Sequence, residues 1–467
     1  MTNVKRITLI TVCLAAILPG NGLWAQQTEA TGTTQTADSV SMPAQWDLQS
    51  CIDYALQQNI SIRRNRINAQ STQVDVKTAK AALFPSLSFS SSQNLVNSPY
   101  QESSSIISGS EVLKSSNKTT YNGNYGLNAQ WTVYNGSKRL KTIEQEKLNN
   151  RVADLDVATS ENDIEQSIAQ VYIQILYAAE SVKVNENTLQ VSEAQRDRGK
   201  QLLDAGSIAR SDYAQLEAQV STDRYQLVTA QATLQDYKLQ LKQLLELDGE
   251  QEMQVYLPAL GDENVLSPLP TKTDVFRSAV ALRPEIEASK LSVEASELGI
   301  GIAKSGYLPS VSLTAGIGTN HTSGSDFTFG DQVKNGWNNS IGLSISVPIF
   351  NNRQTKSAVE KAKLQYQTSQ LTLLDEQKTL YKTIEGLWLD ANSAQQRYAA
   401  AIEKLHSTQT SYELVSEQFN AGMKNTVELL TEKNNLLQAQ QELLQSKYMA
   451  ILNTQLLKFY QGDKITL

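Results

Sequence analysis

The sequence predicts a mainly α-helical chain that also contributes four strands to a transmembrane β-barrel, built as an internal two-fold repeat. Three observations predict this fold class. Four segments alternate apolar with polar side chains over about ten residues each, which is typical of barrel strands. Two proline-free segments of about 65 residues are each followed by a segment with heptad spacing, as in antiparallel coiled coils. The same series of motifs occurs twice along the chain.

The N-terminal segment has the pattern of a secretory signal peptide. Two basic residues precede an apolar run over 7–18, and small residues follow before Gln26. The run is shorter than the roughly 20 residues that span a membrane, so we expect cleavage of a signal at 1–25. Residues 26–45 are rich in Thr, Gln and Ser without apolar periodicity. They are expected to form a disordered leader.

Charge and cysteine content exclude several function classes. The chain carries a formal net charge of −7, which argues against nucleic-acid binding, because that needs a basic face. Cys51 is the single cysteine beyond the expected signal peptide, so no internal disulfide is possible. We expect Cys51 to be a small buried hydrophobe. No later segment is apolar for about 18 residues, so no membrane-spanning helix is expected.

The expected domain organisation follows from the repeat. The junction Phe84-Pro85-Ser86 is paralleled by Leu308-Pro309-Ser310, and the turn Ala205-Gly206 is paralleled by Ala421-Gly422. Several prolines between the two units mark a linker. The expected segments are a first unit at 46–245, the linker at 246–270, a second unit at 271–460 and a C-terminal tail at 461–467.

Long helices account for most of each unit. Proline is absent from 139–203 and from 353–419, and each segment would reach roughly 100 Å as a helix. After an Ala-Gly turn, a helix of about 35 residues is expected to return along each one. Shorter helices are expected at 60–82 and 285–306. A return helix and a short helix together nearly match a long helix, so the two are expected to stack end to end beside it.

The four strands are expected at about 86–96, 121–134, 310–320 and 337–350. Aromatic side chains gather at the strand ends, as at membrane interfaces, and the expected interface residues are Phe84, Tyr134, Tyr307, Phe350 and Trp337. Open strand edges are not tolerated in lipid, so four strands require further copies of the chain. Two copies give eight strands, whose interior is filled by side chains, so a conduit needs three or more copies.

These features together resemble the TolC-like outer-membrane efflux proteins, the outer membrane factors. The resemblance extends from Trp46 to Tyr460, and it rests on the repeat, the helix-to-strand junctions, the strand end Val347–Asn351 and the two Ala-Gly turns. It implies a homotrimer with a twelve-stranded barrel in the bacterial outer membrane, in contact with outer-membrane lipid, and a helical tunnel in the periplasm. It also implies no cofactor, no metal and no enzymatic activity.

The resemblance further implies a passive exit duct of a tripartite efflux or type I secretion system. Its partners would be a periplasmic adaptor (membrane fusion) protein and an inner-membrane pump, and its cargo would be small toxic molecules or exported polypeptides. The two helix turns would close the periplasmic tip and dock the adaptor. The turn residues are Leu203, Asp204, Ala205, Gly206, Phe419, Asn420, Ala421 and Gly422.

The motif Thr426–Leu430 resembles the segment that forms an acidic constriction ring in this family. Glu428 matches the ring acid, and three such carboxylates around a narrow axis would attract cations. Thr431 stands where the family's type member has a second acid, and Glu432 follows it. The resemblance therefore implies one ring at Glu428 and leaves a second ring open.

The resemblance also implies a latch between the two turns. Lys424 matches a basic latch residue, and Ser211 and Asp212 match its hydroxyl and acid partners. Phe419 stands where the family has an aromatic residue with a hydroxyl, so that hydrogen bond is expected to be absent. Solvated charges at helix ends are the simpler interpretation of the same residues.

Two other protein classes fit part of the sequence. A secreted coiled-coil structural or adhesion protein would have heptads and a signal peptide, but not four amphipathic strands placed in two repeats. A periplasmic adaptor would have one helical hairpin and a lipoyl-like domain, which the sequence does not indicate. His321, in an expected external loop, and His406, on a long helix, have no partners at metal-ligand spacing, and no catalytic motif occurs.

Overall fold

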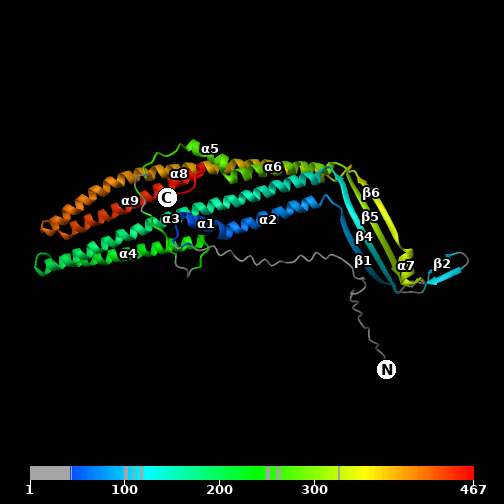
Figure 1. Ribbon diagram of the computed structural model, residues 1–467, viewed down its shortest axis with the longest axis horizontal. Helices are drawn as coiled ribbons and strands as arrows, with labels where there is room; N and C mark the ends of the chain where they lie inside the picture. Colours follow the sequence, from blue (N-terminus) through cyan, green and yellow to red (C-terminus); the bar gives the residue numbers. More distant parts are fainter. Residues whose placement is uncertain are drawn as a thin grey trace, which may run out of the picture. The chain divides into compact units, whose positions relative to one another are not determined.

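A computed structural model describes residues 43, 45–98, 119–248, 253–258, 261, 265–323, 325 and 327–466, and the backbone of residues 104–108 and 111–115. Apart from Pro43, these residues belong to one compact unit, Gln45–Leu467. The expected signal peptide and most of the expected leader lie outside the described residues. The unit is mainly helical with a small antiparallel sheet, which confirms the coarse fold class (Figure 1). Within this part of the chain, no helix combines the length and apolarity needed to cross a membrane.

One antiparallel sheet contains strands from both halves of the chain, in the order β1-β4-β5-β6. The strands are β1 (Ser86–Asn97), β4 (Thr119–Asn135), β5 (Ser310–Thr322) and β6 (Asn338–Ser346). Asn135 of β4 lies opposite Ser310 of β5, and Ser310 lies opposite Ser346 of β6. The sheet therefore has two open edges, which are β1 on one side and β6 on the other.

The connections between strands contain structure that the sequence patterns do not predict. Between β1 and β4, the short strands β2 (Ser104–Ser108) and β3 (Glu111–Ser115) pair antiparallel. β6 ends before Pro348, whereas alternation suggested a strand as far as about Phe350. Proline has no N–H to donate to a strand ladder, so pairing ends before it.

His321 corrects one expectation from the sequence. It belongs to β5 and not to the loop that follows, where the helix α7 (Phe329–Asn335) is found. The His321 ring stacks on Tyr125 at a centroid distance of 5.8 Å and meets Phe329 edge-on at 5.0 Å. An aromatic cluster thus joins α7 to the end of the sheet away from the long helices.

Four helices form a layer in which α2 contacts α3, α3 contacts α6, and α6 contacts α8 (Figure 1). Their bounds are α2 (Ile60–Ala81), α3 (Lys138–Asp204), α6 (Pro284–Lys304) and α8 (Gln354–Asn420). The proline-free segments are α3 and α8, each with 67 residues. The return helices α4 (Arg210–Leu244) and α9 (Thr426–Gln461) pack along α3 and α8 respectively. A single 3-10 turn, Ser305–Tyr307, joins α6 to the strand that follows.

Two eleven-residue helices precede the short helices of the layer, and the sequence patterns do not predict them. They are α1 (Leu48–Gln58) and α5 (Lys272–Leu282). Asn59 and Arg283 separate them from α2 and α6, because both residues leave the helical conformation, with ψ of 128° and 126°. The chain therefore changes direction at these two residues.

Asn59 also joins α4 to α2 end to end. Its Nδ2 donates to the Leu244 carbonyl at 3.1 Å, and its Oδ1 accepts from the Ser61 N–H at 2.9 Å. The Glu246 carboxylate accepts from the Ile60 N–H at 3.2 Å. The last carbonyls of α4 and the first N–H groups of α2 thus find partners where the helices meet, as helix ends require.

Arg283 joins α9 to α6 by a different chemistry. Its Cζ lies 4.3 Å from the Phe459 ring centroid and 4.0 Å from that of Tyr460, both at the end of α9. Arg283 is buried, and burial lowers the pKa of its guanidinium, which Tyr460 and the carboxylate of Glu285 oppose. A cation over aromatic rings therefore stabilises this second junction.

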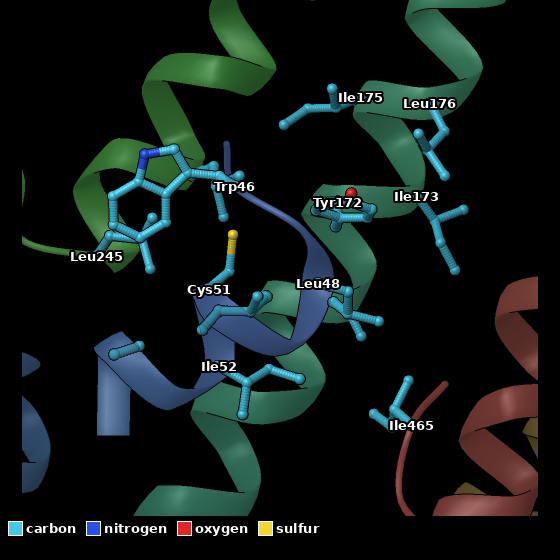
Figure 2. Packing of buried hydrophobic residues seen from close by; sticks show 14 of the residues in the cluster. Trp46, Leu48, Cys51, Ile52, Tyr172, Ile173, Ile175, Leu176, Leu245 and Ile465 are labelled. Atoms are coloured by element: carbon cyan, nitrogen blue, oxygen red, sulfur yellow. The ribbon is translucent and has the colours of Figure 1, made fainter. Parts of the chain in front are cut away.

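The largest core lies where α1 packs on α3. Trp46, Cys51 and Ile52 meet Tyr172 of α3 and Leu245 after α4, all of them buried (Figure 2). The expected linker also packs here. The Trp46 N–H donates to the Gln254 carbonyl at 2.9 Å, and the Tyr172 hydroxyl donates to the Tyr256 carbonyl at 2.5 Å.

Each long helix ends at an Ala-Gly turn with the same geometry. Gly206 and Gly422 have φ of +72° and +74°, the left-handed conformation that the sequence predicts. The Ser207 N–H donates back to the Leu202 carbonyl at 2.7 Å, and the Met423 N–H donates to the Gln418 carbonyl at 2.8 Å. These are Schellman bonds, which satisfy carbonyls at helix C-termini.

Cys51 provides a test of the core. Burial raises the pKa of its thiol to about 12, so almost no thiolate forms near pH 8. In a chain that begins at Gln26, we expect Cys51 to react with a thiol reagent at least about 100-fold more slowly than an exposed control thiol, Ser71→Cys. Reaction at similar rates in the folded protein would contradict this packing.

The turn glycines provide a second test. Gly206→Ala and Gly422→Ala should each lower the free energy of unfolding by about 1 kcal/mol, because a Cβ disfavours positive φ. A Cβ at either position meets no atom within 4 Å, so the effect isolates the backbone. Gly386→Ala, in equally open space within α8, should instead stabilise the helix by up to about 1 kcal/mol. Thermal unfolding followed by circular dichroism measures all three, and the same sign for all would contradict the assignment.

Candidate functional site

The ends of the two long helices lie close together near their turns. The Gln195 Nε2 of α3 donates to the Tyr412 hydroxyl of α8 at 2.7 Å. A groove of about 440 Å³ opens beside this bond, and its lining includes Arg198 of α3 and Leu429 of α9. The structure therefore brings together the two helix ends that the sequence singles out.

Phe419 belongs to this groove and is 5% exposed. It lies one residue before the end of α8, where its ring packs inward while the turn itself is exposed. The other exposed turn residues are Asp204, Ala205, Gly206, Asn420, Ala421 and Gly422, with Leu203 half-buried. Phe419 thus fills space at the tip without offering a hydrogen bond.

Glu428 lies in the first turn of α9, where it completes a helix cap. The Glu428 N–H donates to Asn425 Oδ1 at 2.9 Å, and the Asn425 amide donates to the Glu428 carboxylate at 2.9 Å. A carboxylate at this position is also stabilised by the helix dipole. The Asn-Thr-Val-Glu sequence carries the spacing of a capping box, a signal from which Asn425 could have been predicted.

Thr431 and Glu432 follow Glu428 on the same side of α9, three and four residues later. The Thr431 hydroxyl donates to the Val427 carbonyl at 2.7 Å. The Glu432 carboxylate accepts from the Ser411 hydroxyl of α8 at 3.0 Å, so it ties α9 to α8. The two carboxylates of this face therefore have different surroundings within the chain.

Lys424 has another partner than the predicted one. Its ammonium forms an ion pair with Glu428, and both side chains are 39% exposed. Asp212, the predicted partner, accepts from the Ala209 N–H at 3.3 Å and so caps the start of α4. Ser211 is exposed beside it. An ion pair this exposed contributes about 0–1 kcal/mol.

The aromatic residues at the strand ends are exposed. Strand register places Phe84, Tyr134, Tyr307 and Phe350 at the end of the sheet where the long helices begin or end. Phe84 is 73% exposed and Phe350 is 84% exposed. Trp337, at the opposite end of the sheet before β6, is 58% exposed. Large aromatic surfaces are thus uncovered at both ends of the strands.

Among the residues that the structure describes, no group of three or more His, Cys, Asp or Glu side chains is placed to hold a metal ion. His406 lies on α8, as the sequence predicts. The polar groups near the turns are held by hydrogen bonds and ion pairs at helix ends. Their arrangement serves contact between helices and a charged surface.

Comparisons with known proteins identify the family. A profile of the family described as "Outer membrane efflux protein" matches residues 51–246 and 275–462. The outer membrane protein TolC of Escherichia coli (strain K12) is 24% identical over 409 residues, covering 85% of this chain and 78% of TolC. The probable efflux pump outer membrane protein TtgC of Pseudomonas putida is 22% identical over 438 residues, covering 90% of this chain and 84% of TtgC.

Solved structures show the same fold. A structure of CusC, described in connection with transmembrane channel formation, matches with a TM-score of 0.75 at 19% identity, covering 91% of this chain and 95% of the CusC chain. The relatives are outer-membrane proteins of efflux, which sets aside the alternative of a secreted coiled-coil adhesion protein. The chain belongs to the outer membrane efflux protein family, and it is an outer-membrane export channel and not an enzyme.

Proposed function

We propose that three copies of this chain close into one hollow duct, with a twelve-stranded barrel in the outer membrane and a helical tunnel in the periplasm. One observation carries the proposal: the sheet and the helical layer are both open at two edges. The edges are β1 and β6 in the sheet, and α2 and α8 in the helical layer. Each edge of one copy is suited to meet the opposite edge of the next.

The strand edges support this closure. β1 is exposed along all of its residues, and the alternate side chains Leu87, Phe89, Ile341 and Leu343 present a large apolar surface. Lipid accommodates such a surface, but it does not accommodate the unpaired N–H and carbonyl groups of β1 and β6. Pairing β1 of one copy with β6 of the next removes those groups, and three copies leave a water-filled interior.

The helix edges carry a matching signal. Ile60, Ile67 and Val74 recur every seven residues on α2 and are at least 56% exposed. Leu364 and Leu371 recur in the same way on α8, and they are 62% and 66% exposed. Apolar heptads are the spacing with which helices pack in coiled coils. A contact between two different edges repeats around an axis and closes into a ring.

At the tip, we propose that Glu428 of three copies forms the constriction and that the two Ala-Gly turns dock a periplasmic adaptor joined to an inner-membrane pump. The partial exposure of Glu428 and the full exposure of the turn glycines support these roles. The name of the relative TtgC, an efflux pump outer membrane protein, supports a cargo of small toxic molecules. The aromatic residues Phe84, Phe350 and Trp337 would lie at the membrane interfaces.

Substitution at the α2 edge tests the trimer. Ile67→Glu should dissociate the detergent-extracted particle into single chains, because it places a charge within an apolar coiled-coil contact. Gln73→Glu adds the same charge to an exposed position away from the stripe and should leave three copies. Light scattering of the purified protein in detergent counts the copies. A trimeric Ile67→Glu variant, or a wild-type protein recovered without detergent, would overturn the proposed assembly.

Substitution of the proposed ring acid tests the constriction. In planar-bilayer recordings, Glu428→Gln should lower the preference for cations by about threefold or more, because it removes three charges from the narrowest point. Glu432→Gln should have the smaller effect, because Glu432 is tied to Ser411 of α8. Selectivity unchanged in Glu428→Gln would remove Glu428 from the ring, and a wild-type protein that never conducts would overturn the duct itself.

A further inference from the structure

A buried ion pair joins the two helical hairpins above the tips. The Lys433 ammonium of α9 contacts the Asp223 carboxylate of α4, and both contact the Ser192 hydroxyl of α3. The side chains of Lys433 and Asp223 are 4% and 1% exposed. By contrast, the Lys404–Glu442 pair, which joins α8 to α9 within one hairpin, is 40% and 42% exposed. We refer to Lys433, Asp223 and Ser192 as the buried tie.

Apolar side chains surround the buried tie along each helix. Leu429 and Leu437 lie one turn to either side of Lys433 on α9, and Val220 lies one turn before Asp223 on α4, all of them buried. The remaining carboxylate oxygen of Asp223 accepts from Gln219 Nε2 at 2.9 Å. The carboxylate is thus hydrogen-bonded on both oxygens, which offsets its removal from water.

Separating these groups is unfavourable. If α9 moved away from α3 and α4 at this level, an ammonium and a carboxylate would be left unpaired in an apolar seam. Burial lowers the pKa of Lys433, and the contact with Asp223 opposes that change, so the charged form depends on the pair. The exposed Lys424–Glu428 pair at the tip carries no such penalty. The two ion pairs therefore differ greatly in how readily movement disrupts them.

We propose that the buried tie is the pivot of tip opening: the start of α9 and the Ala421-Gly422 turn move, while α9 beyond Lys433 stays bound to α3 and α4. Glu428 lies five residues before Lys433, about 8 Å toward the turn along the helix. The moving part therefore includes the proposed constriction. The tie limits how far that part moves, and this role rests on the proposed duct.

A variant without either charge tests the pivot. Lys433→Met with Asp223→Leu removes both charges and keeps apolar side chains of similar volume in the seam. It is examined with Lys424→Ala, which frees the start of α9 from its exposed ion pair. Because conductance follows the radius of the constriction, the combined variant should conduct about twofold more than Lys424→Ala alone. The matched control, Lys404→Met with Glu442→Leu in the same background, should change conductance little.

Hydrogen exchange of the wild-type protein gives a second measurement that needs no substitution. If Lys433 is a fixed point, amides over 426–432 should exchange at least about tenfold faster than amides over 434–444. Uniform protection across Lys433, or equal conductance of the charge-free variant and its control, overturns the pivot. Those results leave the duct intact if the wild-type protein conducts as a trimer. A wild-type protein that forms no conducting trimer overturns both proposals.

Discussion

A helix of 67 residues needs a packing partner along its whole length, and in this chain two shorter helices supply it by meeting end to end. α3 is covered by α4 and α2, with 35 and 22 residues, and α8 by α9 and α6, with 36 and 21. Asn59 closes one junction by bonding the end of α4, and Arg283 closes the other by lying on two rings of α9. These contacts fix where α2 and α6 begin, and therefore where the strands after them start.

The helices and strands could be predicted because each depends on a local property of the sequence. The absence of proline over 139–203 and 353–419 predicts α3 and α8, and alternation predicts a sheet. The short helices α1 and α5 could not be predicted in this way, because eleven residues carry little periodicity. Their ends depend on the conformations of Asn59 and Arg283, which are set by the α4 and α9 ends packed against them.

The site was less predictable, because charged residues on a helix look alike until their neighbours are known. Lys433 and Asp223 occur among many other charges, and such residues are usually solvated. Only the packing of α9 against α3 and α4 places them in contact and away from water. Lys424 shows the opposite case. It was expected to reach Asp212 on the other turn, but Glu428 lies one helical turn away and Asp212 already caps α4.

Glu428 combines three roles that draw on the same negative charge. It caps α9 through Asn425, it pairs with Lys424, and in the proposed trimer it lines the constriction. The first two roles place positive charge beside each carboxylate, from an ammonium and from the helix dipole. Three such carboxylates therefore approach one another at a lower electrostatic cost than three bare acids would. Mutual repulsion alone is then too weak to open the constriction, and opening has to come from a partner that moves the start of α9.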